Sequence, residues 1–155
     1  MLATPKSLEA EHDELMGTLR QASSLEDETG RAVSELMKHL EPHFEKEEKV
    51  AMPLLGTLAD LVSGEKISNL RDIAESQKPL LQEYEGMFQE HKLLGKFIER
   101  AKNEAQRENH QEIVEILEAL AHHAKVEEEV LYPAALLAGT LARVMLNNEA
   151  QPIIV

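Results

Sequence analysis

The chain contains no cysteine, no tryptophan and few other aromatic residues. Without cysteine it cannot form a disulfide, a thiolate zinc site, a thiol nucleophile or a cysteine-ligated iron–sulfur cluster. Any metal site must therefore use histidine and carboxylate ligands. Basic residues are also scarce, because 16 Lys and Arg stand against 29 Asp and Glu, for a formal net charge of −13. Such a surface repels phosphate groups, so we expect neither nucleic acid nor a membrane as a partner.

Long apolar runs are missing as well. No stretch reaches the ~18 uninterrupted apolar residues of a membrane-spanning helix, and the first residues lack the basic segment and apolar run of a secretory signal. We therefore expect a cytoplasmic chain with a single domain over residues 1–155. It has no G-x-S-x-G motif and no Gly-rich phosphate loop, so the sequence leaves open whether the chain is an enzyme.

Leu, Ala, Glu and Lys dominate the composition, which is typical of helices. Apolar residues at helical spacing predict four main helices, over about 5–21, 29–62, 79–108 and 111–146. A short helix around 67–74 is expected before the third. The predicted fold class is all-α, an antiparallel up-down-up-down four-helix bundle.

Each of the four predicted helices carries histidine within its apolar stripe, and two of them also carry glutamate there. These residues are His12 on the first helix, His43 and Glu47 on the second, His91 on the third, and His123 and Glu127 on the fourth. A single histidine on an apolar face is usually a hydrogen-bonded core residue. Four histidines beside two buried carboxylates indicate a bound metal instead, because a buried carboxylate is costly unless it is protonated, paired or bound to a cation.

The sequence also repeats itself, in halves of about 5–62 and 77–147. Glu11-His12 recurs as Glu90-His91, and a longer block recurs at an offset of 80 residues. In that block Leu36, Leu40, His43, Glu47, Glu48 and Pro53 correspond to Ile116, Leu120, His123, Glu127, Glu128 and Pro133. A His and a Glu four residues apart lie on one helix face, about 6 Å apart along the axis, so both can reach one ion or two adjacent ions.

With both copies of this H and H-x3-E-E-x4-P pattern, the chain resembles the hemerythrin-like, or HHE cation-binding, family from about His12 to Pro133. The resemblance implies a four-helix bundle around a non-haem centre of two Fe ions. It also implies the ligands: His12 and His43 at one iron, His91 and His123 at the other, and Glu47 and Glu127 as bridges. Imidazole and carboxylate ligands without thiolate suit iron chemically.

The chain departs from the oxygen carriers of that family, which have a fifth histidine in an H-x3-H pair on the third helix. Here Met87 and Gly95 stand four residues before and after His91. The carriers also end their second half in a His and an Asp at a different spacing. The chain is therefore more similar to the broader HHE branch, which is linked to oxygen, nitric oxide or iron handling.

Two further histidines are candidate ligands. His39 lies one turn before His43, and its alternative role is that of a solvated residue. His122 projects about 100° away from His123 and is a candidate for an outer or peripheral position. Four glutamates off the inner stripe are either solvated or support the ligand imidazoles: Glu11, Glu48, Glu90 and Glu128.

The resemblance thus implies a di-iron protein that reversibly binds or senses a small ligand, oxygen or nitric oxide, or handles iron. The alternative function is that of a helical interaction module with a structural or vestigial metal site. A ferritin-like di-iron site fits less well, because it needs Glu-x-x-His twice and only Glu9-x-x-His12 occurs. In the metal-free chain, burial is expected to raise the pKa values of Glu47 and Glu127.

Overall fold

The computed structural model describes residues 2–150. Its elements in chain order are α1 (Lys6–Ser23), α2 (Glu28–Val50), α3 (Met52–Leu55), α4 (Leu58–Val62), α5 (Leu70–Arg107), α6 (Gln111–Val126), the π-helix η1 (Glu127–Leu131) and α7 (Tyr132–Ala150). No strand occurs within these residues, so the predicted all-α class is confirmed.

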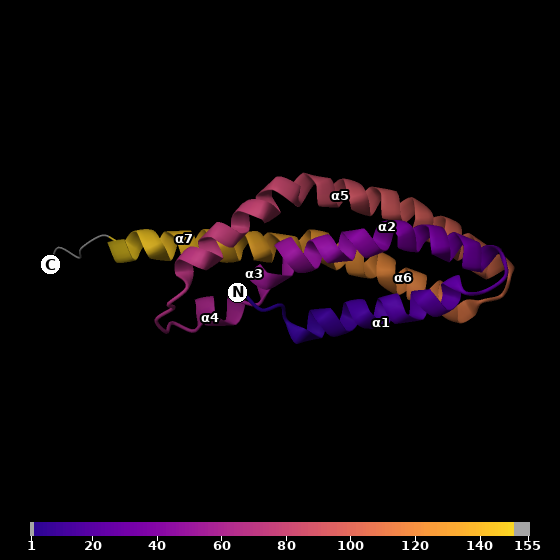
Figure 1. Ribbon diagram of the computed structural model, residues 1–155, viewed down its shortest axis with the longest axis horizontal. Coiled ribbons are helices and arrows are strands. Elements are labelled where there is room, and N and C mark those ends of the chain that lie inside the picture. The colour runs from indigo at the N-terminus through magenta and orange to yellow at the C-terminus, as the bar shows by residue number, and fades with distance from the viewer. Residues whose placement is uncertain (1, 151–155) are drawn as a thin grey trace.

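Four of the helices, α1, α2, α5 and α6, lie side by side (Figure 1). α1 contacts α2 and α6, and α5 contacts the same two helices, so each of the four has two neighbours in the group. α7 continues the line of α6 beyond the other helices and packs against α5 and α3. The layout leaves one shared interior along the length of the four helices.

The second predicted helix is shorter than expected. It was predicted to run to residue 62, but α2 ends at Val50, and the chain resumes as the short helices α3 and α4 after Ala51 (φ −108°). Pro53 explains the break, because its ring has no N–H to donate to the carbonyl of Lys49 and would collide with it. The predicted end of this helical segment at residue 62 is confirmed, because α4 ends at Val62 and is followed by Ser63 and by Gly64 at φ +76°.

The third predicted helix is longer than expected. The separate short helix at 67–74 does not form as such, because α5 runs without interruption through Pro79 and arches over the molecule (Figure 1). Packing holds the helix together there: the buried Gln77 amide donates to the Leu136 carbonyl at 2.7 Å. Gly139 allows this close approach of α5 and α7, because a Cβ at that position would lie 2.5 Å from Gln77.

The fourth predicted helix is divided by a π-helix. α6, η1 and α7 follow one another without a loop and end at Ala150, past the expected end at 146. Pro133, whose missing N–H disturbs regular α-helical bonding, is the second residue after η1. Pro152, near which the tail was expected to leave the helix, lies outside the described residues.

The stretch Gln111–Glu149 is long and apolar enough to cross a membrane by length and composition. Core helices of folded domains pass the same criterion, and this one carries two of the predicted ligands on its inner face. The expected absence of a membrane partner stays a prediction.

Two apolar clusters fill the interior and leave a polar layer between them. One includes Leu40, Phe44 and Leu94, and the other includes Val50 and Met87. Residues 40 and 50 lie on the same helix, on either side of the stretch with the inward-facing His and Glu of α2. The apolar core therefore continues on both sides of the site.

Candidate metal centre

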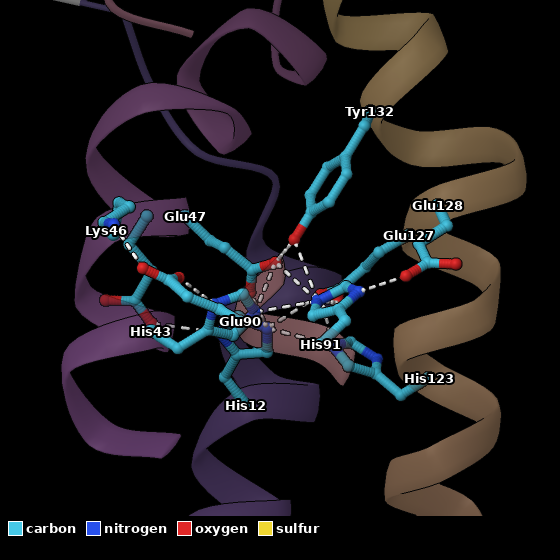
Figure 2. Close-up of polar contacts among 11 residues, drawn as sticks. His12, His43, Lys46, Glu47, Glu90, His91, His123, Glu127, Glu128 and Tyr132 are labelled. Carbon is cyan, nitrogen blue, oxygen red and sulfur yellow. Dashed lines mark hydrogen bonds and ion pairs between the residues drawn. The ribbon is translucent and has the colours of Figure 1, made fainter. Parts of the chain in front are cut away.

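The six predicted ligand residues meet in the polar layer (Figure 2). They are His12 of α1, His43 and Glu47 of α2, His91 of α5, His123 of α6 and Glu127 of η1. Each of the six is at most 7% exposed. The structure thus gathers every residue of the predicted set, while metal ligation by them stays a prediction.

The donor atoms form two groups that share both carboxylates. We name them the His43/His91 group and the His12/His123 group after their imidazoles. In the Glu47 carboxylate, Oε1 lies 3.2 Å from His43 Nε2 and Oε2 lies 3.6 Å from His12 Nε2. In the Glu127 carboxylate, Oε2 lies 3.3 Å from His91 Nε2 and Oε1 lies 2.6 Å from His123 Nε2. Each carboxylate therefore gives one oxygen to each group, as a bridging ligand would.

The imidazoles group differently from the pairing that the resemblance implies. His12 Nε2 lies 3.1 Å from His123 Nε2, and His43 Nε2 lies 2.8 Å from His91 Nε2. The pairs therefore join the two halves of the sequence and not the histidines within a half. Phe44 of α2 stacks on the His12 ring with centroids 3.8 Å apart, so an apolar ring occupies the side of His12 that faces α2.

Removal of both imidazoles from one group should leave the other ion in place. We expect the double variant His12→Ala/His123→Ala to retain about one iron per chain after anaerobic loading with Fe(II). The variant His12→Ala/His43→Ala should retain less, because each group then loses an imidazole. Elemental analysis measures both values, and the opposite order would restore the pairing by sequence halves.

A carboxylate holds the outer nitrogen of every imidazole in the centre. The Nδ1 contacts are His12 with Glu48 at 3.2 Å, His43 with Glu90 at 2.7 Å, His91 with Glu128 at 3.0 Å, and His123 with Glu11 at 2.9 Å. An Nδ1–H that donates to a carboxylate fixes the ring orientation and leaves Nε2 free to bind a cation. These glutamates therefore support the imidazoles, which is one of the two roles that the sequence left open for them.

Tyr132 also belongs to the centre, although the helical stripe did not single it out. Its buried hydroxyl donates to Glu47 Oε1 and lies 3.2 Å from His91 Nε2. Burial raises the pKa of this hydroxyl, and the nearby Glu47 and Glu127 carboxylates raise it further. In a regular α-helix, Tyr132 would project about 140° away from Glu127, five residues earlier. The sequence offered one signal for this role: Tyr132 is one of two tyrosines and directly precedes Pro133, where a helix is expected to be irregular.

Two carboxylate oxygens of the centre lack a hydrogen-bond donor. Among the described residues, none donates with hydrogen-bond geometry to Glu47 Oε2 or Glu127 Oε1, although His123 Nε2 lies close to the latter. Both oxygens are buried and both face the His12/His123 group. A cation satisfies such oxygens, so the donor set fits a bound metal.

The carboxylates control the protonation of the imidazoles in the metal-free centre. Burial alone would lower the pKa of His91, but the adjacent Glu127 and Glu47 carboxylates raise it to about 10. Burial would likewise lower the pKa of His123, but Glu127 and Glu11 raise it to about 9. Without metal, these rings are therefore charged at neutral pH.

The raised pKa expected for the buried carboxyl groups is wrong for Glu127. Burial alone would raise its pKa, but the imidazoles of His12, His123 and His91 hold it well below its usual range. The burial of Glu127 was predicted correctly from the sequence, but the effect of several imidazoles around this one carboxylate was not. In the metal-free centre, the protons thus reside on histidine and not on Glu127.

These pKa shifts predict how the stability of the metal-free protein depends on pH. His91 and His123 bind protons more tightly in the folded state than in the unfolded chain, where the pKa is about 6.5. Their contribution is complete below pH 6.5 and is lost as the pH rises through 9 to 10. Urea unfolding in the presence of a chelator should show this decline. His91→Ala should flatten it, while His122→Ala should preserve it, and a stability that rises over this window would contradict the assignment.

The additional candidate ligands do not lie among the donor atoms. His39 is exposed and stacks on Phe97 with centroids 4.4 Å apart, and His122 is exposed on α6. Neither belongs to a group of potential ligands in the part of the chain that the structure describes. Both lie on the outer faces of their helices, so their closeness to a predicted ligand along the sequence does not bring their side chains into the centre.

A cavity of about 320 Å³ reaches the centre from the side of α2, α5 and α6. Its wall combines apolar residues, including Leu94 and Ile98, with His91 and His123 of the centre. Gly95 is also part of the wall, and a Cβ at this position would meet no atom within 4 Å. Gly95, one of the two positions four residues from His91, therefore borders open space beside the centre.

In a comparison with known protein families, residues 4–135 match the hemerythrin HHE cation binding domain. Comparisons with curated proteins and with solved structures find no match. The matched range covers nearly the whole chain and contains all six predicted ligands.

Proposed function

Because the chain belongs to the hemerythrin HHE cation-binding domain family, we propose that it holds two iron ions in a non-haem centre and binds a small ligand there reversibly. The proposed ligand is oxygen or nitric oxide. Sensing of such a ligand and iron handling are variants of the same proposal, because they use the same centre. The observation that carries the proposal is the division of each buried carboxylate between two pairs of imidazoles.

The donor set supports two ions of one kind. Each group supplies two imidazole nitrogens and one oxygen from each shared carboxylate, so the two positions have matching protein ligands. Imidazole and carboxylate without thiolate suit iron. Bound iron would supply reversible redox chemistry and a coordination position for a diatomic ligand.

We also infer that the centre lies in a four-helix bundle formed by an internal duplication. The contacts of the outer glutamates support this inference, because they follow a two-fold pattern. Glu48 and Glu128 hold the histidine of their own half, whereas Glu11 and Glu90 hold a histidine of the other half. Corresponding residues thus make corresponding contacts.

The protein residues around the centre favour a small, weakly polar ligand. The exposed surface of the cavity at Gly95 is mainly apolar, and the imidazoles of His43, His91 and His123 also line it. The outer carboxylates hold the rings, so a ligand that enters the cavity meets a fixed set of groups. The cavity is thus the expected route of entry.

The experiment is the optical spectrum of the reduced, iron-loaded protein before and after anaerobic addition of nitric oxide, and separately before and after air. We expect a new visible band that disappears when the gas is removed. Gly95→Leu should slow the appearance of the band by filling the cavity, while Gly17→Leu should not. Gly17 is a matched control, because it is an exposed helical glycine with open space at its Cβ and lies outside the cavity.

The alternative function, a helical interaction module with a structural metal, predicts a different result. Iron would then raise the melting temperature, but neither gas would change the spectrum. That result would overturn the proposal of reversible ligand binding.

A further inference from the structure

Tyr132 enters the metal centre from the side of α7 (Figure 2). Its hydroxyl contacts Glu47 Oε1 and His91 Nε2, and both of these atoms belong to the His43/His91 group. The ring packs against Phe88 and the His91 ring, with centroids 5.9 and 5.6 Å away. The phenol oxygen is therefore held at one of the two ion positions.

The π-helix produces this placement. The Tyr132 backbone N–H donates to the Glu127 carbonyl, five residues earlier, in place of the usual partner four residues earlier. The wider turn brings residue 132 round toward the side of the helix occupied by Glu127. π-Helical turns are rare in proteins, but those that occur often lie at functional sites. Here the turn connects a bridging carboxylate to the phenol.

The distance from the phenol oxygen to His91 Nε2 matches that between neighbouring ligands of one ion. Donors bound at right angles, each about 2.1 Å from the metal, lie about 3.0 Å from each other. In the His43/His91 group, the two Nε2 atoms are 2.8 Å apart, and Tyr132 Oη is 3.2 Å from His91 Nε2. Glu127 Oε2 is 3.3 Å from the same nitrogen.

We propose that Tyr132 Oη is a fifth protein ligand of the ion in the His43/His91 group and binds ferric iron as a phenolate. In this step the phenol O–H bond breaks, an Fe–O bond forms, and the proton leaves to solvent. Phenolate is a hard oxygen donor that suits Fe(III). The inference rests on the proposed function, because it requires iron in this group.

The two iron positions are then chemically different. The residue that corresponds to Tyr132 in the first half is Met52, at the offset of 80 residues. A thioether is a soft ligand and a poor one for ferric iron. At this position of the repeat, only the second half therefore supplies an oxygen donor.

The test is the visible spectrum of the Fe(III)-loaded protein, with iron content measured on the same sample. Phenolate bound to Fe(III) gives an intense charge-transfer band, and excitation within it enhances phenolate ring vibrations in the resonance Raman spectrum. We expect this band in the wild type and its complete loss in Tyr132→Phe. Tyr84→Phe is the matched control, because it removes the other tyrosine of the chain and should retain the band.

The outcomes separate this inference from the proposed function. Two bound irons without phenolate vibrations would overturn the role of Tyr132 as a ligand and leave it a hydrogen-bond donor to Glu47. Absence of bound iron would overturn both proposals. If Tyr132→Phe failed to fold, the Raman spectrum of Tyr84→Phe would still decide, because Tyr132 is then the sole tyrosine.

Discussion

Replacement of Glu127 by glutamine should reduce the iron content from about two per chain to less than one. Glu127 gives one oxygen to each group, so the substitution removes an anionic ligand from both ion positions at once. The amide also introduces N–H donors, which face the imidazole nitrogens and the incoming cations. Elemental analysis after anaerobic loading with Fe(II) measures the effect.

Glu128→Gln is the matched control for this experiment. Glu128 is the next residue, but it contacts His91 Nδ1 and not the ion positions. We expect this variant to keep two irons with an affinity lowered about 10- to 100-fold, as is typical of groups that hold a metal ligand from outside. Equal loss of iron in the two variants would show that Glu127 does not act as a bridge.

Iron should raise the melting temperature by about 10 °C. A metal that binds only the folded state adds RT ln(1 + [L]/Kd), or about 4 kcal/mol at a thousandfold excess over Kd. For a chain of this size, 1 kcal/mol corresponds to about 2–4 °C. Anaerobic thermal melts followed by circular dichroism, with Fe(II) and with a chelator, measure the shift.

The metal-free protein should nevertheless fold. The two apolar clusters lie on either side of the polar layer, and neither contains any of the six histidine and glutamate ligands predicted from the sequence. Glu127→Gln should show little stabilisation by iron and serves as the control. An unfolded chain in chelator would mean that the clusters are insufficient without metal, and an unchanged melting temperature would mean that iron does not bind the native state.

The sequence predicted which six residues meet in the polar layer because helical periodicity and the internal repeat both depend on local spacing. His43 and Glu47 are four residues apart, so any regular helix places them on one face. The partner of each histidine could not be predicted in this way. It depends on how α1 packs beside α6, and on the Phe44 ring against His12, both of which are properties of the assembled helices.

Prolines and the π-helix explain the remaining differences. Pro53 ends α2, whereas Pro79 is accommodated within α5, where Gln77 bonds to α7. The local sequence does not distinguish these outcomes, because both depend on tertiary contacts. Tyr132 was missed for a related reason: regular helical geometry turns it away from Glu127, and the π-helix before Pro133 reverses this.

The most direct test of the central claim is the number of irons that one chain binds. Purified protein is loaded with excess Fe(II) without oxygen, freed of unbound metal, and assayed for iron and protein. Because two imidazole pairs share two carboxylates, we expect about two irons per chain. A value of zero or one at saturation would contradict it.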